Sequence, residues 1–348
     1  MNPLVFFLLS FTVIMGTLMT LMSNHWLTAW MGLELNTLAI IPLMTKNHHP
    51  RTTEAATKYF LIQAIASATI LLASIFNTWT TGQWNIYYMT HPTASVMVYS
   101  ALCLKLGLAP LHTWLPEILQ GLNLMTGMIL STWQKLAPMA LIVQIPNNHP
   151  NILLTVGMVS MLVGGWGGMN QTQTRKLLAY SSIAHMGWII VALSLLPSLS
   201  HLALLLYIIM TTSTFLGLAH IQATNISHLS LSWIKTPILT CLILLALITL
   251  GGLPPLSGFM PKWLIISEMT KQGMLPLTLL AAMSSLLSLF FYTRLAFITT
   301  LTISPNNTPL SISWRTTHTN FNMLLSPLLA SSIFLIPLTP LLLYAFMP

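Results

Sequence analysis

The stretch "GLAPLHTWLPE", residues 107–117, carries two prolines, a histidine and a glutamate although apolar runs surround it. A second stretch, "GLPPLSGFMPK" at residues 252–262, repeats its order of glycine, leucine, proline and aromatic residue 145 positions later. Seven of the eleven columns match in identity or type, and the last column holds opposite charges. The chain therefore contains two copies of one polar motif whose prolines disturb helices.

The composition indicates that both copies lie in a membrane protein. Hydrophobic residues make up 55% of the 348 residues and charged residues only 5%, which is too few to cover a soluble globule. Twelve lysines and arginines against four glutamates give a formal charge of +8. Because these basic residues are scattered singly between apolar runs, they favour lipid headgroups and not nucleic acid as partners.

The cysteine content argues against a redox centre on this chain. Only Cys103 and Cys241 are present, and both lie in apolar runs. Two such thiols do not supply the ligand set of an iron–sulfur cluster or of a structural zinc site. We therefore expect no cofactor and no metal on this chain, and any redox chemistry on another one.

The length of the apolar runs gives the expected fold class. A bilayer-spanning helix needs roughly 20 mostly apolar residues, so the chain is predicted to be an all-α polytopic membrane protein with about 11 transmembrane helices. The expected spans cover roughly residues 3–22, 25–44, 55–77, 95–120, 124–145, 151–169, 177–196, 202–222, 237–270, 275–299 and 323–346.

Basic residues fall mainly on one side of these spans. That side receives Lys46, Arg51, Arg175, Lys176, Lys235 and Arg315, and Arg294 is able to reach it. The other side receives only Lys271. The positive-inside tendency then places the N-terminus on the matrix or cytoplasmic side and the C-terminus on the opposite side.

The two motif copies lie on predicted spans that are an odd number of spans apart, so the second copy is inserted upside down. This predicts two inverted five-helix repeats, one covering roughly residues 1–148 and the other roughly 149–300, with a loop and a C-terminal transmembrane helix in 301–348. Each repeat holds one broken helix, at roughly 95–120 and 237–270, because proline removes a helical hydrogen bond. The prolines concerned are Pro110, Pro116, Pro254, Pro255 and Pro261. Discontinuous helices in inverted repeats are typical of ion-coupled transporters, although single prolines also occur in helices that are merely kinked.

Four ionisable residues lie inside the expected spans, where a charge costs ~2.5–3.5 kcal/mol on insertion scales. They are Glu34, Lys105, Lys135 and Lys262. Burial disfavours the charged forms of both residue types, whereas close pairing favours them. A glutamate–lysine pair can therefore change protonation when one partner moves, and we expect these residues to form a proton relay in which Glu34 pairs with Lys105. A structural ion pair or a lysine that reaches the headgroups is the simpler alternative.

Two histidines are weaker candidates for the relay. His185 lies near the centre of a predicted span beside tyrosine and serine, where it can equally satisfy a packing hydrogen bond. His112 lies within the first motif copy.

Four stretches, "KLGLAPLHTWLPE", "TGMILSTWQKLAP", "QTQTRKLLAYSSIAHMG" and "GGLPPLSGFMPKW", resemble motifs of the antiporter-like membrane subunits of respiratory complex I, the mitochondrial NADH:ubiquinone oxidoreductase. The resemblance runs over the whole chain and has the character of a vertebrate, more narrowly mammalian, sequence. More widely, the chain is similar to subunits of multisubunit sodium/proton antiporters.

The resemblance implies a central polar axis that carries protons. It assigns Glu34 to the family glutamate, Lys105 to the first broken helix, Lys135 to the connecting lysine and Lys262 to the charged residue of the second broken helix. It also implies a place in the mitochondrial inner membrane, with FMN, iron–sulfur clusters and ubiquinone on other subunits. The implied partners are other membrane-arm subunits including neighbouring antiporter-like chains, accessory subunits, and phospholipids such as cardiolipin.

The expected function is therefore proton translocation as a subunit of NADH:ubiquinone reductase, without redox catalysis on this chain. Two other classes stay open at this point. A stand-alone cation/proton antiporter would use the same polar axis, and a structural scaffold subunit would retain the axis only as a vestige.

Overall fold

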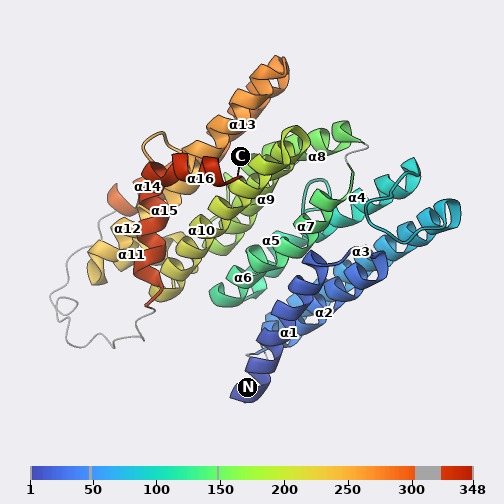
Figure 1. The fold of residues 1–348 in the computed structure, drawn as a ribbon. Coiled ribbons are helices and arrows are strands. Elements are labelled where there is room, and N and C mark those ends of the chain that lie inside the picture. The colour runs from blue at the N-terminus through green and yellow to red at the C-terminus, as the bar shows by residue number, and fades with distance from the viewer. Residues whose placement is uncertain (1, 47–48, 147–148, 302–322, 347–348) are drawn as a thin grey trace. The chain divides into compact units, whose positions relative to one another are not determined.

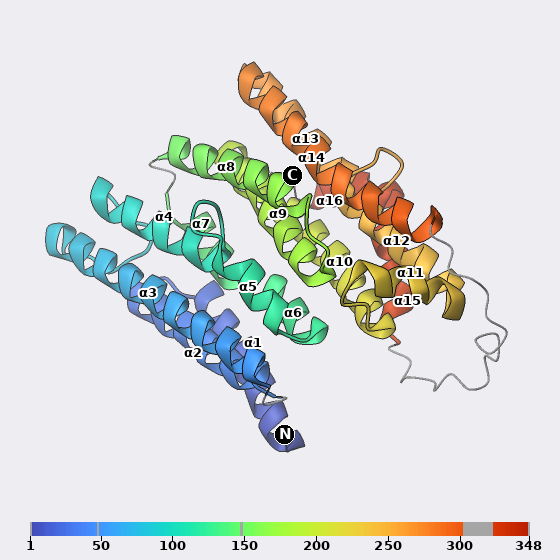
Figure 2. The same ribbon diagram turned by 180° about the vertical axis from the view of Figure 1, so that it is seen from behind.

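The computed structural model describes residues 2–46, 49–146, 149–301 and 323–346, and in these ranges its regular elements are helices. The chain divides into two compact units, Met1–Val156 and Gly157–Pro348, which are described separately below (Figures 1 and 2). The predicted all-α class is confirmed for this part of the chain.

Unit 1 begins with three long helices that lie side by side (Figures 1 and 2). They are α1 Pro3–Leu21, α2 Trp26–Met44 and α3 Pro50–Thr81. The side chains of Asn2 and His49 cap α1 and α3, each of which has proline in its first turn. Small residues let α1 and α2 approach closely, since a Cβ atom on Gly16 would stand 2.9 Å from the carbonyl oxygen of Gly32.

Shorter helices complete unit 1, and α4 and α5 pack against α3. These elements are α4 Pro92–Leu106, α5 Trp114–Gly121, α6 Leu124–Ser131, the 3-10 turn η1 Trp133–Lys135 and α7 Leu136–Gln144. The next helix, α8 Pro150–Gly168, runs across the boundary between the two units.

In unit 2, α10 packs against α9, α12 and α15 (Figure 2). The elements are α9 Thr174–Leu195, α10 Pro197–Ile221, α11 Ile226–Lys235, α12 Pro237–Gly251, α13 Phe259–Lys271, α14 Leu275–Leu301, α15 Leu325–Phe334, the 3-10 turn η4 Ile336–Leu338 and α16 Thr339–Phe346. In the most apolar window of α9, 89% of the residues are buried inside the protein, so this helix forms the core of the unit.

Among the described residues, seven helices are long and apolar enough to cross a membrane, which makes the chain a multi-span membrane protein. They are α1, α2, α3, α8, α9, α10 and α14. The helices α4 and α12 are apolar but shorter. Several spans that were predicted as single helices are thus divided into pieces.

The predicted helix at 323–346 is one of the divided spans. It consists of α15 and α16, which are bent by 68° relative to each other. Pro337 and Pro340 lie at the bend, and proline cannot donate the hydrogen bond that would continue the helix. The segment predicted as a C-terminal transmembrane helix is thus divided by a bend, and the loop predicted around Arg315 lies outside the described residues.

The predicted helix at 124–145 is also interrupted, which the sequence interpretation did not foresee. The chain forms the 3-10 turn η1 between α6 and α7. Pro138 has no amide hydrogen for the carbonyl of Gln134, and its ring crowds that carbonyl. The turn before Pro138 consequently tightens, and Lys135 becomes the last residue of η1.

The chain leaves the helical conformation at both motif copies, and the two backbones follow one plan. Each first half-helix ends at a glycine in the left-handed conformation, Gly107 with φ 73° and Gly252 with φ 82°. The second half-helices, α5 and α13, begin seven residues later in each case. Pro110, Pro254 and Pro255 lie in the non-helical connections.

Pro116 and Pro261 have a different place from the other motif prolines. Each is the third residue of its second half-helix, α5 or α13. The amide of a first-turn residue has no partner within the helix, so proline is tolerated there. The left-handed glycines end the first half-helices, and these two prolines lie in the starts of the second ones.

Candidate functional site

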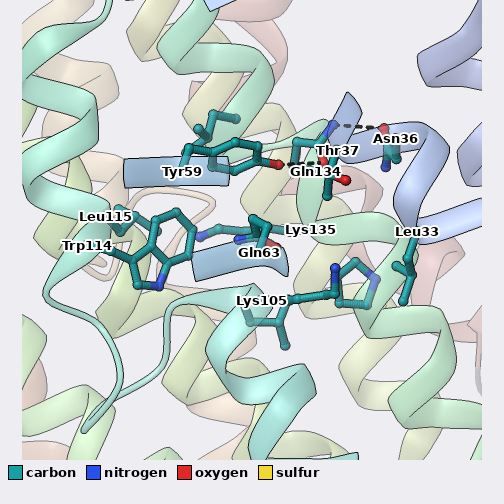
Figure 3. A pocket seen from close by; sticks show the side chains of 13 residues that line it. Leu33, Asn36, Thr37, Tyr59, Gln63, Lys105, Trp114, Leu115, Gln134 and Lys135 are labelled. Carbon is teal, nitrogen blue, oxygen red and sulfur yellow. Dashed lines mark hydrogen bonds between the residues drawn. The ribbon is translucent and has the colours of Figure 1, made fainter. Parts of the chain in front are cut away.

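A small cavity in unit 1, lined by apolar and polar side chains, lies beside the first break (Figure 3). We call six of its polar lining residues the first polar cluster: Asn36, Tyr59, Gln63, Lys105, Gln134 and Lys135. Thr37 is a further polar residue in the lining. The cavity has a volume of about 20 Å³, which is room for about one water molecule. Two of the predicted relay lysines, Lys105 and Lys135, thus line the same space.

Lys105 lies in the last turn of α4, two residues before the left-handed Gly107. Only 7% of its surface is exposed. Its ammonium nitrogen is buried and makes no hydrogen bond within the described ranges. A cation near a helix C-terminus is favoured by the partial negative charge of the free carbonyls.

The carbonyl end of α4 is held by an aromatic side chain from across the break. The indole nitrogen of Trp114, the first residue of α5, donates a hydrogen bond of 3.1 Å to the carbonyl of Leu104. Trp114 also lines the cavity, and its ring centroid lies 6.2 Å from that of Tyr59. The position of Lys105 at the cavity therefore depends on contacts between α4, α5 and α3.

Lys135 reaches the cavity from η1 and is 4% exposed. Its neighbour Gln134 donates a hydrogen bond of 2.8 Å to the side-chain oxygen of Asn36 on α2. Gln134 also accepts a hydrogen bond of 3.4 Å from the hydroxyl of Tyr59 on α3. Figure 3 shows both bonds as parts of one chain across the cavity wall.

Glu34 lies half-buried on α2, between the cavity-lining residues Leu33 and Asn36 in the sequence, but it does not line the cavity itself. Its carboxylate accepts a hydrogen bond of 3.1 Å from Thr37. No nitrogen–oxygen distance of 4.0 Å or less joins Glu34 to Lys105 in the part of the chain that the structure describes. The glutamate nevertheless acts electrostatically on Lys105 and on Tyr59. Glu34 and Lys105, the predicted partners, thus interact electrostatically at a distance but do not form a close ion pair.

The remaining polar residues of the first break lie away from the cavity. His112 is half-buried in the connection, with its Nδ1 atom 3.2 Å from the carbonyl oxygen of Pro110. Glu117 on α5 is exposed and pairs with Lys58 of α3 at 3.0 Å. Lys58 also pairs with Glu54 at 2.9 Å, so this charge cluster joins α5 to α3.

A second small cavity, also lined by apolar and polar side chains, lies in unit 2 beside the second break. Its volume is about 10 Å³, and its polar lining residues, the second polar cluster, are Ser181, His185, Lys262, Ser288 and Tyr292. Lys262 of α13 is 6% exposed and donates a hydrogen bond of 2.7 Å to the carbonyl of Gly251. The His185 ring lies 5.7 Å from the ring of Tyr207. The structure thus brings two predicted residues, Lys262 and His185, to one cavity.

The neutral residues of the first polar cluster were missed in the sequence interpretation. Asn36, Tyr59, Gln63 and Gln134 carry amide or hydroxyl groups inside apolar segments, where an unpaired polar group is costly. Only ionisable residues within the spans were predicted as site residues. Side-chain amides inside apolar segments are a further signal, and they identify three of these four residues, Asn36, Gln63 and Gln134.

Metal ligation has no support in the described residues. No group of three or more histidine, cysteine, aspartate or glutamate side chains comes together there. Both clusters offer proton binding by lysine and tyrosine, to which the second adds His185. The first cluster adds hydrogen bonding by amides and the second by serine hydroxyls.

Comparison with known proteins gives this arrangement a family. Residues 23–288 match the model of the NADH:quinone oxidoreductase/Mrp antiporter transmembrane family, and residues 289–343 match that of the NADH dehydrogenase subunit 2 C-terminus. The NADH-ubiquinone oxidoreductase chain 2 of Tetraodon nigroviridis is 58% identical, and that of Squalus acanthias is 55% identical. Each comparison covers 98% of this chain and 98% of the relative.

A solved structure has the same fold. A chain in respiratory complex I from Thermus thermophilus with bound aureothin superposes with a TM-score of 0.83 at 26% identity, covering 98% of this chain and 80% of that one. On the extent of these matches, the chain belongs to the NADH:quinone oxidoreductase/Mrp antiporter transmembrane family, together with the NADH-ubiquinone oxidoreductase chains 2 of vertebrates.

Proposed function

We propose that this chain is an antiporter-like subunit of the membrane arm of mitochondrial NADH:ubiquinone oxidoreductase and takes part in proton translocation. The observation that carries the proposal is the placement of buried lysines at both helix breaks, each beside a small cavity that further polar side chains help to line. Electron transfer from NADH to ubiquinone, with FMN and iron–sulfur clusters, takes place on other subunits. This chain contributes proton-binding groups whose charge responds to those events.

The proposed relay uses Glu34, Lys105, Lys135 and Lys262. Lys105 and Lys135 line one cavity with room for about one water molecule, which is the medium through which a proton passes between them. Glu34 acts on Lys105 through the field of its carboxylate, so a shift of either helix changes the tendency of Lys105 to hold its proton. Coupling of this kind requires that one event biases two arrangements of the same element. The interrupted helices are the elements proposed for this role.

We assign auxiliary roles to the histidines. His185 shares its cavity with Lys262 and is suited to exchange a proton with it through a bridging group. His112 lies in the connection of the first break, outside the cavity lining, so its contribution is proposed to be weaker.

The proposed topology has about 11 passes in two inverted repeats, covering roughly residues 1–148 and 149–300, with 301–348 as the C-terminal part. The seven long helices, the bent pair α15–α16 and the interrupted segments α4–α5, α6–α7 and α12–α13 support this number of passes. The matching backbone plan of the two breaks supports the repeat.

The proposed orientation places the N-terminus on the matrix side of the inner membrane and the C-terminus on the intermembrane-space side, because the basic residues gather on one side of the predicted spans. The proposed partners are other membrane-arm subunits including neighbouring antiporter-like chains, accessory subunits and anionic phospholipids such as cardiolipin. Singly placed lysines and arginines at helix ends suit lipid phosphates.

The substitution Lys135→Met tests the function in the assembled enzyme reconstituted into vesicles. We expect the rate of proton translocation to fall strongly, because methionine cannot carry the proton. Lys271→Met is the matched control, since Lys271 is a largely exposed lysine paired with Glu268. Unchanged proton translocation in Lys135→Met, or a loss that only follows lower assembly, would favour a scaffold role. Sodium-dependent proton exchange by the isolated chain would favour a stand-alone antiporter.

A further inference from the structure

Gln134 is the centre of the hydrogen-bonded chain across the first cavity (Figure 3). Its amide nitrogen donates to Asn36 at 2.8 Å, and its amide oxygen accepts from Tyr59 at 3.4 Å. Asn36 belongs to α2 and Tyr59 to α3, whereas Gln134 belongs to η1. One side chain therefore connects the turn to two long helices.

The same side chain connects the backbones that carry two proposed relay residues. Asn36 follows Glu34 by two residues on α2, and Lys135 directly follows Gln134. Asn36 is 2% exposed and its hydrogen bond with Gln134 is partly buried, so solvent competes less for this bond than at the surface. The Gln134–Asn36 hydrogen bond is thus a short mechanical connection between the Glu34 helix and the Lys135 turn.

The local backbone makes such a connection necessary. Pro138 provides no amide hydrogen to the carbonyl of Gln134, so the regular helical ladder is interrupted at this turn. A 3-10 turn has poorer hydrogen-bond geometry than an α-helix and holds its residues less firmly. The side-chain bonds of Gln134 supply a constraint that the backbone lacks.

The chemistry of an amide suits positioning and not proton storage. Glutamine donates and accepts at the same time, and both capacities are used here in a fixed direction from Tyr59 through Gln134 to Asn36. An amide does not titrate in the neutral range, so its bonds persist while the neighbouring lysines change charge. The connection therefore transmits displacement without taking part in the proton transfer.

We propose that Gln134 is a positioning residue that holds the turn carrying Lys135 against the helix carrying Glu34, so that displacement of one segment moves the other. This inference rests on the proposed function, because it concerns the geometry of that relay. Its energetic basis is a partly buried hydrogen bond at a point where the backbone ladder is broken.

The test uses the assembled NADH:ubiquinone oxidoreductase containing this chain, reconstituted into vesicles, with NADH oxidation and proton translocation measured per assembled enzyme. Gln134→Met keeps the length of the side chain and removes both hydrogen bonds. We expect the rate of coupled proton translocation to fall roughly twofold to tenfold, the factor that corresponds to the net contribution of one hydrogen bond. Gln144→Met is the matched control, because Gln144 is a glutamine of the same interrupted span that bonds to the Leu21 carbonyl and does not line the cavity.

A paired exchange separates positioning from a general structural role. Gln134→Asn shortens the amide by one methylene and is expected to lower translocation, and adding Asn36→Gln restores the reach between the two amides. We expect the double variant to recover most of the rate. Failure of this recovery would overturn the proposal, as would Gln134→Met translocating protons at the natural rate. If the Gln134 variants do not assemble with or without Asn36→Gln, while Gln144→Met does, the role is structural only and the proposal is wrong.

Measuring Lys135→Met in the same series distinguishes failure of the proposed function from failure of the positioning role of Gln134. If Lys135→Met translocates protons normally, the proposed function fails whatever the Gln134 variants do. If Lys135→Met loses translocation and Gln134→Met keeps it, the relay stands and only the positioning role of Gln134 is refuted.

Discussion

The ammonium group of Lys262 donates a hydrogen bond of 2.7 Å to the carbonyl of Gly251, the last residue of α12. A cation at this place satisfies a carbonyl that has no helical partner and lies at the negative end of the helix dipole. In unit 1 the corresponding end of α4 is held by the neutral indole of Trp114. The two breaks thus share one backbone plan, but only the second is held by a group that can lose its charge.

Gly252→Ala tests the dependence of the second break on its glycine. The φ of 82° disfavours any side chain, at a cost of roughly 1–2 kcal/mol, and an added Cβ atom would also stand 2.9 Å from the Lys262 ammonium nitrogen. We expect faster thermal inactivation of the assembled enzyme together with slower proton translocation. Gly82→Ala is the control, since Gly82 has a φ of 71° but nothing within 4 Å of an added Cβ atom.

The comparison of these two variants separates backbone strain from displacement of Lys262. Gly82→Ala is expected to speed thermal inactivation through strain alone and to leave translocation per assembled enzyme unchanged. Equal translocation by both variants would show that the position of Lys262 against Gly252 has no part in the function.

Trp114→Phe tests the first break. Phenylalanine keeps an aromatic ring beside Tyr59 but cannot donate to the Leu104 carbonyl, which retains its bond from the Gly107 amide at 3.1 Å. The loss is therefore that of one hydrogen bond, about 0.5–1.5 kcal/mol. We expect moderately faster thermal inactivation and a lower rate of proton translocation, because the last turn of α4 carries Lys105.

Trp79→Phe is the control for this substitution, as 85% of the Trp79 surface is exposed. It should change neither the inactivation rate nor the translocation rate of the isolated assembly. A Trp114→Phe enzyme that translocates protons like the Trp79→Phe enzyme would show that the indole bond does not help to position Lys105.

The breaks could be predicted from the sequence because their cause is local. A glycine in the left-handed conformation and a proline, which has no amide hydrogen, each interrupt the helix at their own position, whatever side chains pack around them. The interruption before Pro138 has the same kind of cause. It was not predicted because the length of the apolar run favours one continuous helix, although the run contains a proline. The bend between α15 and α16 was missed for the same reason.

The composition of the cavities could not be predicted in the same way. Whether Asn36 faces Gln134 depends on how α2, α3 and η1 pack, and these segments are far apart in the sequence. Likewise, the expected Glu34–Lys105 pair was inferred from residue types, whereas their separation is set by the packing of α2 against its neighbours. Charge in an apolar run identifies a candidate, but only the packed structure gives its partner.

Glu117 and Lys262 occupy equivalent positions in the two motif copies, yet the structure gives them opposite environments. Glu117 and its partner Lys58 are 56% and 43% exposed, whereas Lys262 is 6% exposed and bound to a helix end. Exposed ion pairs contribute little because water competes for both charges, whereas a buried charge-assisted bond is lost at full cost. We therefore expect Glu117→Gln to leave thermal inactivation and proton translocation near the natural values, and Lys262→Gln to impair both. Parallel measurement on the two assembled variants checks this, and a larger defect in Glu117→Gln would contradict the assignment of the functional charge of the motif to the second copy.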